Sequence, residues 1–298
     1  MFQVSTGGIL NLNKPAGITS RDVVNVVQCL AGRKMRVGHA GTLDPLARGV
    51  LVVSVGPATR LIEYIQQMPK TYRAEFLLGC HSDTEDTDGQ VTRLETPLVP
   101  SEEEIRTVLP QFTGRILQRP PAYSALRIAG RRAYDLARKG KQIELAPREI
   151  VVYQLLLDEY NYPKLGLTIQ CGSGTYVRSL GRDLAESLGT AAVMSALERT
   201  AIGRFRIEEA VDPDSLTPEN WTDALLPPVM AVSHLTKLTL DDEAVRKIQD
   251  GLTIPRPKGI DPAADTVAVD QTGRLIGILT GRGREQLKTK RNFPTRLP

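Results

Sequence analysis

The sequence has few of the features that mark membrane, secreted and metal-binding proteins. Its 298 residues include three cysteines, which lie far apart at Cys29, Cys80 and Cys171. An odd number of isolated cysteines argues against a disulfide framework and a zinc site, and it suits a reducing compartment. No apolar run approaches the ~20 residues of a membrane-spanning helix, and Met1–Gly8 has neither the basic nor the apolar segment of an export signal. We therefore expect a cytoplasmic protein with no membrane partner and no structural metal.

Hydrophobic content and charge indicate a folded protein with a polyanionic partner. Hydrophobic residues make up 41% of the chain, enough to bury the cores of one large domain and one small one. Residues 115–148 contain nine Lys or Arg and two Asp or Glu, and residues 281–298 contain six and one. Two basic segments on an otherwise acidic chain favour a polyanion held at defined places. Charge alone is equally compatible with two solvated faces.

Hydrophobic periodicity predicts a mixture of strands and helices. The expected strands are Gly8–Asn13, Val50–Val55, Thr71–Leu78, Ile150–Leu157 and Leu165–Cys171. The expected helices begin after the capping-box pattern Thr19–Asp22 and at Ser101, and cover Arg131–Lys139 and Tyr176–Leu188. Four prolines between residues 213 and 228 place a domain boundary near residue 230, before a short helix at 241–250 and strands at 266–269 and 275–279. Because strands and helices do not alternate strictly, the expected fold class is α+β.

The most informative stretch is a glycine-rich loop, Gly38–Gly49, which reads GHAGTLDPLARG. Its glycines allow tight turns or a close approach to a ligand, and Pro45 disfavours a helical backbone at Asp44. A carboxylate on a rigid loop can act as a nucleophile or base. The residues alone leave open whether Asp44 acts chemically or only shapes a turn.

This stretch resembles the signature of the TruB-type tRNA pseudouridine synthases, G-H-x-G-T-L-D-P-x-A-x-G, at every fixed position. Five more segments resemble elements of that family in the same order: Asn13–Ser20, Lys70–Tyr72, Thr84–Gly89, Arg119–Ala125 and Gly174–Leu180. The tail beyond residue 230 is more loosely similar to a PUA domain. The resemblance therefore covers nearly the whole chain.

The resemblance implies an α+β fold in which residues 1–230 form a pseudouridine synthase catalytic domain with a mixed, mainly antiparallel sheet. It also implies a basic RNA-binding insertion at about 115–148 and a small PUA-like RNA-binding domain at 231–298. The compact length and the insertion look more like the stand-alone bacterial type, which isomerises uridine 55 in the TΨC arm of tRNA. We expect a monomer that acts on tRNA by base flipping, without cofactor or metal, because the isomerisation adds no atom and no electrons.

Three residues would carry the chemistry that the resemblance implies. Asp44 would be the essential carboxylate, which either attacks the sugar or removes a sugar proton to give a glycal. Arg178 would keep Asp44 ionised in a site that also encloses a uracil. Tyr72 would stack on the flipped base and help to remove the C5 proton.

Other matched residues would position the substrate. His39 would help to take the target base out of its stack. Asp86 would orient Tyr72 or other groups of the site, and Leu197 would form an apolar wall near the base. The remaining expected RNA contacts are Lys14, Arg127, Arg131 and Arg132.

Three rival interpretations remain open. A non-catalytic RNA-binding or tRNA-folding protein would use the basic segments equally well, but it gives Asp44, Tyr72 and Arg178 no shared role. A metal-dependent hydrolase would use His39, Asp44 and Asp86, although no metal-ligand spacing supports it. A guide-RNA-dependent relative would share the catalytic motifs.

Overall fold

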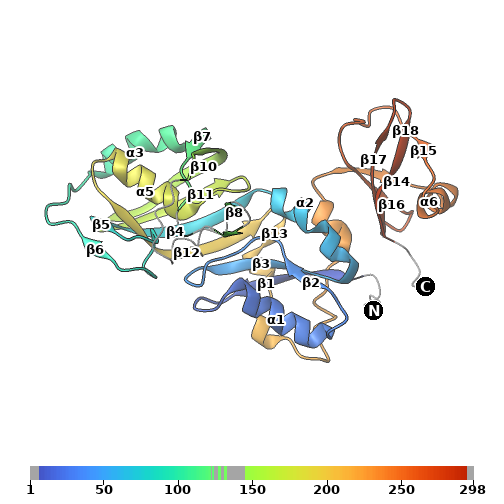
Figure 1. Ribbon diagram of the computed structural model, residues 1–298, viewed down its shortest axis with the longest axis horizontal. Helices are drawn as coiled ribbons and strands as arrows, with labels where there is room; N and C mark the ends of the chain where they lie inside the picture. Colours follow the sequence, from blue (N-terminus) through green and yellow to red (C-terminus); the bar gives the residue numbers. More distant parts are fainter. Residues whose placement is uncertain (1–6, 122, 124–126, 129–130, 133–144, 294–298) are drawn as a thin grey trace.

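The computed structural model describes residues 7–121, 123, 127–128, 131–132 and 145–293. Figure 1 shows an elongated molecule in which a long sheet with helices occupies most of the length and a small part lies at one end. Within the described ranges, no helix is both long enough and apolar enough to cross a membrane.

A nine-stranded sheet forms the large part, counted over the described residues. Its main path runs β1–β3–β12–β4–β11–β10–β7, with β2 beside β3 and β13 beside β12. The strands are β1 (Gly8–Lys14), β2 (Val37–His39), β3 (Arg48–Val55), β4 (Lys70–Leu78), β7 (Gly114–Gln118), β10 (Arg148–Asn161), β11 (Lys164–Cys171), β12 (Ala192–Ile202) and β13 (Phe205–Arg206). Every pair is antiparallel except β3 with β12. The sheet is therefore mixed and mainly antiparallel.

The central strands follow their sequence patterns. All of β3 from Gly49 to Val55 is buried, because neighbouring strands flank it and both of its faces are covered. This burial explains an apolar run that only Ser54 interrupts. Strand β4 instead alternates between buried and more exposed positions, as a period of two predicts. Strand β3 follows the loop that contains Asp44, and β4 contains Tyr72.

The large part contains the helices α1 (Ser20–Ala31), α2 (Ile62–Gln67), α3 (Glu102–Val108) and α5 (Val177–Ser187). Of these, α1 and α3 begin where their capping residues predict. Thr19 and Asp22 form the expected capping box of α1, and Ser101 caps α3 in the same way. Helix α5 buries Leu180 and Leu184 in the core on the sheet, on the side that α3 also covers (Figure 1). That packing fixes the first turn of α5 at the site.

Two parts of the sheet region differ from the sequence-based expectation. A helix over Arg131–Lys139 cannot begin at its first residue, because Arg131–Arg132 forms strand β9, which pairs with Arg127–Ile128 in β8. The rest of that stretch lies outside the described residues. Hydrophobic periodicity also does not reveal β12, because charged residues such as Glu198 and Arg199 interrupt its pattern.

The small part is built on a five-stranded sheet with the order β14–β16–β17–β18–β15, among the residues described. Its elements are β14 (Thr236–Thr239), α6 (Asp242–Gln249), β15 (Ile254–Pro255), β16 (Thr266–Val269), β17 (Leu275–Arg282) and β18 (Gln286–Asn292). The expected helix and both expected strands of the tail are confirmed. Two short pairings complete the strand set, β8 with β9 and β5 (Cys80–His81) with β6 (Thr92–Arg93).

Helix α2 joins the two parts through buried contacts. The hydrophobic cluster that contains Ile65 of α2 also contains Val267 and Phe293 of the small part. Beside it, the Tyr64 hydroxyl donates a hydrogen bond to the Asp265 carboxylate at 2.8 Å. The small part therefore packs against α2 and is not merely tethered to the large one.

Candidate active site

The aspartate loop, Ala40–Ala47, connects β2 to β3 and carries Asp44 in a non-helical conformation. After the loop the chain enters β3, whose second residue, Gly49, has a φ of 103°. A Cβ atom at that position would lie 2.3 Å from the carbonyl oxygen of Arg199 on β12. Glycine is therefore required there, both for the backbone angle and for the close approach of the two strands.

Gly17 and Ser20, at the start of α1, hold the loop from one side. The Ser20 hydroxyl donates to the Leu43 carbonyl at 3.0 Å and accepts from the Leu43 amide at 2.8 Å. The Gly17 amide donates to the Pro45 carbonyl at 2.8 Å. These bonds fix the residues on either side of Asp44, so they fix the direction of its side chain.

Lys14 is buried beneath the loop, which corrects the expectation that it contacts RNA. Its side chain is 0% exposed, and its ammonium donates to the carbonyls of Pro15, Ile18 and Pro45 at 2.8, 2.6 and 3.4 Å. Burial lowers the pKa of Lys14 from 10.5 to about 8, and the nearby Asp44 carboxylate opposes that shift. Lys14 thus positions the loop and places a positive charge near Asp44.

Arg199 holds the loop from the other side and was not expected from the sequence. It is 1% exposed on β12 and donates to the carbonyls of Val50 at 2.7 Å and Gly41 at 3.0 Å. The detectable signal is a charged residue within an otherwise strand-compatible run, Ala192–Ile202. Its partners lie about 150 residues earlier in the chain, so sequence reasoning could not identify them.

Asp44 and Arg178 form an ion pair, as the resemblance implies. Arg178 Nε lies 3.1 Å from Asp44 Oδ2. The Arg178 side chain is 8% exposed, whereas that of Asp44 is 36% exposed. The arginine is therefore a fixed, largely buried counter-ion, and the carboxylate remains open to a ligand.

The acidic turn, Ser82–Asp88, holds the other edge of the Arg178 guanidinium. Arg178 Nη1 lies 3.1 Å from Asp86 Oδ2 and donates to the Thr84 carbonyl at 2.7 Å. Nη2 donates to the Tyr123 carbonyl at 3.3 Å. Asp86 is 3% exposed, so it orients Arg178 rather than contacting RNA or Tyr72.

A cavity of about 160 Å³ opens beside the ion pair. Its lining residues are Thr42, Leu43, Asp44, Tyr72, Tyr123, Thr175, Tyr176, Val177, Arg178 and Leu197. The structure thus brings together Asp44, Tyr72, Arg178 and Leu197, which lie in four separate segments of the chain. One carboxylate, one guanidinium, aromatic rings and aliphatic side chains suit a flat, partly polar ligand.

Tyr72 lies on β4, opposite Arg199 of β12 in the sheet register. It is 8% exposed. Burial raises the pKa of Tyr72 above its ordinary value, and the Arg199 charge opposes that shift. The phenol therefore keeps its proton at neutral pH and can donate a hydrogen bond within the cavity.

His39 does not line this cavity. It is the last residue of β2 and is half-buried. Its pKa is lowered, first by burial and then by the charges of Arg199 and Arg21, so the imidazole is neutral at pH 7. For Arg127, Arg131 and Arg132 only the backbone is described, in β8 and β9, and their side chains lie outside the described structure.

Two tyrosines in the cavity belong to matched motifs but had no expected role. The Tyr123 carbonyl accepts a hydrogen bond from Arg178, and Tyr176 lines the cavity. The Arg148 guanidinium lies 4.8 Å from the centre of the Tyr176 ring, a stacking distance. Their presence within the motifs Arg119–Ala125 and Gly174–Leu180 was the available signal.

Residues 28–177 match the family described as "TruB family pseudouridylate synthase (N terminal domain)". The chain belongs to this family. The matched residues include the aspartate loop, β4 and the acidic turn, and they end one residue before Arg178.

Named relatives agree with this membership. The tRNA pseudouridine synthase B of Dehalococcoides mccartyi is 43% identical over 251 residues, which cover 83% of each chain. That of Clostridium tetani is 37% identical over 273 residues, covering 91% of this chain and 94% of the relative. Among solved structures, an H/ACA RNP bound to a substrate RNA containing 2'-deoxyuridine matches with a TM-score of 0.74 at 24% identity, over 98% of this chain and 86% of the other. At that identity the last match shows the fold alone.

Proposed function

We propose that this protein converts uridine 55 in the TΨC arm of tRNA to pseudouridine. The observation that carries the proposal is the Asp44–Arg178 pair at 3.1 Å on the wall of a cavity that Tyr72 and Leu197 also line. The family is one of pseudouridylate synthases, and its named relatives are tRNA pseudouridine synthases. The enzyme is thus an isomerase with tRNA as its substrate.

Asp44 is the reacting carboxylate in this proposal. The N1–C1′ bond breaks, the uracil turns and C5 joins C1′. C5 then loses its proton and N1 takes one up, so no atom is gained or lost overall. Asp44 serves this sequence either by attacking C1′ or by taking a sugar proton. The Arg178 guanidinium pairs with Asp44, and the buried cations Lys14 and Arg199 hold its loop, so the reacting group lies among positive charges.

Tyr72 and Leu197 enclose the base. The Tyr72 ring on β4 and the Leu197 side chain on the adjacent strand β12 can hold a flat uracil while it turns. Because burial keeps the Tyr72 phenol protonated, its hydroxyl can guide the base by a hydrogen bond. Removal of the C5 proton by Tyr72 would require a partner that accepts the phenolic proton, and Asp44 lines the same cavity.

RNA docking involves parts of the chain outside the cavity. His39 lies at the start of the aspartate loop, where a neutral imidazole can contact the nucleotide that leaves the helix stack. The basic segment 115–148 and a PUA-like domain at 231–298 would contact the rest of the tRNA, with the catalytic domain at 1–230. Support for the tail assignment is its separate five-stranded sheet and its basic residues at 281–298.

The geometry disfavours the rival interpretations. A metal-dependent hydrolase would need His39, Asp44 and Asp86 around one ion, but the Arg178 guanidinium lies between the two carboxylates. RNA binding alone would not require a carboxylate paired with a buried arginine on the wall of a cavity. The relatives at about 40% identity bear the name of tRNA enzymes, which favours the stand-alone type over a guide-dependent one.

The deciding experiment uses purified full-length protein and an unmodified tRNA transcript carrying tritium at C5 of uridine. Conversion should release tritium and place pseudouridine at position 55, in the presence or absence of EDTA. A transcript with cytidine at position 55 should release none above background. Tight tRNA binding without tritium release would support a non-catalytic RNA-binding protein instead.

A further inference from the structure

Glu85 has an unusual backbone conformation in the acidic turn. Its φ is 63°, and within the described ranges it is the one residue other than glycine with a positive φ. This left-handed region is unfavourable for a residue with a side chain. Such a conformation persists only where the surroundings hold it in place.

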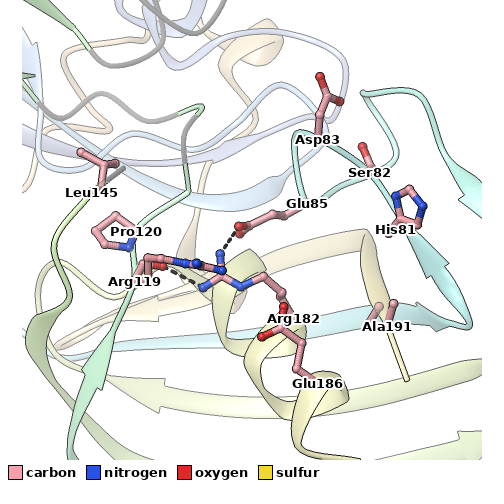
Figure 2. Close-up of a pocket in the computed structure, with 11 residues that line it drawn as sticks. His81, Ser82, Asp83, Glu85, Arg119, Pro120, Leu145, Arg182, Glu186 and Ala191 are labelled. Carbon is pink, nitrogen blue, oxygen red and sulfur yellow. Dashed lines mark hydrogen bonds and ion pairs between the residues drawn. The ribbon is translucent and has the colours of Figure 1, made fainter. Parts of the chain in front are cut away.

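Both the backbone and the carboxylate of Glu85 are held. Met194 of β12 donates its amide to the Glu85 carbonyl at 3.0 Å. The Ser179 hydroxyl donates to Glu85 Oε2 at 2.6 Å, and the Arg182 guanidinium pairs with Oε1. The Glu85 and Arg182 side chains are 11% and 13% exposed. Figure 2 shows them facing each other in a pocket of about 340 Å³ next to α5.

Arg182 also holds a second segment. Its Nη2 donates to the Arg119 carbonyl at 2.8 Å, the contact drawn in Figure 2. Arg178, one helical turn earlier on α5, contacts the same two segments through the carbonyls of Thr84 and Tyr123. Two arginines at i and i+4 therefore each bridge the acidic turn and the residues after β7.

Resting on the proposed function, we infer that Glu85 and Arg182 are positioning residues for the isomerisation. Their ion pair, completed by Ser179, keeps the acidic turn in the conformation that presents the Thr84 carbonyl and Asp86 to Arg178. Arg178 in turn faces Asp44. Without the pair, the turn keeps only the Arg178 contacts on α5, so the Arg178 guanidinium is held less firmly in its direction toward the Asp44 carboxylate.

The Glu85→Gly variant separates this role from backbone strain. Glycine adopts a φ of 63° without penalty, so the turn should fold while the carboxylate is lost. We expect the single-turnover rate at saturating tRNA to fall by about tenfold or more, with the protein still folded and tRNA affinity changed by less than about threefold. A rate within about twofold of the wild type would overturn the inference.

A double-mutant cycle tests whether the two residues act as one unit. Arg182→Met should lower the rate by a similar factor, and the Glu85→Gly/Arg182→Met double variant should be no slower than the worse single variant. If the rate losses of the two single variants multiplied in the double variant, Glu85 and Arg182 would act independently and the inference would be wrong. The matched control is Glu186→Gln, because Glu186 is an exposed residue in the same pocket, one turn further along α5, and should leave the rate unchanged.

A readout independent of turnover is the NMR signal of the Arg178 Nε–H group, assigned with an Arg178→Lys variant. It should be sharp and slow to exchange in the wild type and Glu186→Gln, and broadened or shifted in Glu85→Gly. An unchanged signal in Glu85→Gly would overturn the positioning role even if the rate fell. Wild-type protein with this signal but no tritium release would refute the proposed function and leave the structural coupling intact.

Discussion

The aspartate loop and the acidic turn reach Arg178 from two sides, but different interactions hold them. Backbone groups of the loop bond to Ser20, Lys14 and Arg199, so its anchors contact carbonyls and amides. The acidic turn is held largely by charged side chains, with Asp86 on Arg178 and Glu85 on Arg182. One side depends on hydrogen bonds to the backbone, and the other on carboxylate–guanidinium pairs.

This difference suits the charge that each side must carry. Lys14 and Arg199 direct their hydrogen bonds to carbonyls, and in the part of the chain that the structure describes neither forms an ion pair with a carboxylate. The Lys14 charge lies close enough to interact with Asp44. The acidic turn instead supplies the counter-charge that makes a buried arginine tolerable. Asp44, the proposed reacting carboxylate, thus lies among cations, whereas Asp86 pairs with the opposite edge of the Arg178 guanidinium.

The largest effect is expected at the residue that both sides serve. Asp44→Asn should reduce tritium release by about 10⁴-fold or more, because an amide neither attacks the sugar nor takes a proton. Affinity for tRNA should change little, since the shape of the loop is kept. Single-turnover assays with direct binding measurements check both statements, and a rate near that of the wild type would remove Asp44 from the chemistry.

Arg178→Lys should break the link between the two sides. An ammonium cannot reach Asp44, Asp86 and two carbonyls together, as the planar guanidinium does. We expect the rate at saturating tRNA to fall by about 10²-fold. If Arg178→Lys keeps more than half of the activity, the fork geometry has no role and only the charge matters.

Lys14→Met tests the loop side alone. Removing the ammonium leaves buried carbonyls without a donor, each at a cost of about 1–3 kcal/mol, so the free energy of unfolding should fall by that order. The rate should fall by about tenfold, because the loop loses one anchor and keeps those from Ser20 and Arg199. Denaturant unfolding and single-turnover kinetics measure the two effects. An equally stable and active variant would show that the anchor is redundant.

Titration of Lys14 should separate rate from stability. Its pKa is about 8 in the folded protein, below the ordinary 10.5, so the rate should decline as the pH rises through 8. Stability should change in the opposite direction. Between pH 8 and 10.5 the unfolded chain holds this proton and the folded chain does not, so Lys14 adds stability as the pH rises over that window.

Lys70 is the control for this assignment, because burial also lowers its pKa to about 8. The pH dependence of the rate should survive in Lys70→Met and disappear in Lys14→Met. The reverse pattern would assign the alkaline decline to Lys70.

The smallest effect on the chemical step is expected at the arginines of β8 and β9, which are not among the residues that line the cavity. Replacing Arg127, Arg131 and Arg132 together with alanine should weaken tRNA binding. It should also reduce the salt slope of binding by roughly two to three units, because fewer phosphate contacts form and fewer counterions are released. The rate at saturating tRNA should be close to that of the wild type. Binding isotherms over a salt series provide the measurement, and an unchanged slope would exclude these arginines from RNA docking.

The sequence by itself determined many of the local elements and brought the candidate site residues Asp44 and Arg178 to notice. Capping boxes defined the starts of α1 and α3, and the apolar run Val50–Val55 defined β3. The motifs around Asp44 and Arg178 identified a carboxylate and its arginine partner, because short-range patterns and motif resemblance record what each segment does. The sequence did not predict strand β12 or its central place in the sheet, because charged residues interrupt the hydrophobic period of this segment.

Only the tertiary structure decided the roles of the buried charged residues. Lys14 reads as a surface cation in the sequence, yet it is 0% exposed because carbonyls from two separate segments converge on it. Arg199 and the Glu85–Arg182 pair likewise act through partners 97 to 158 residues away. Burial of a charge depends on which distant groups can satisfy it, and that is a property of the packed chain rather than of any one segment.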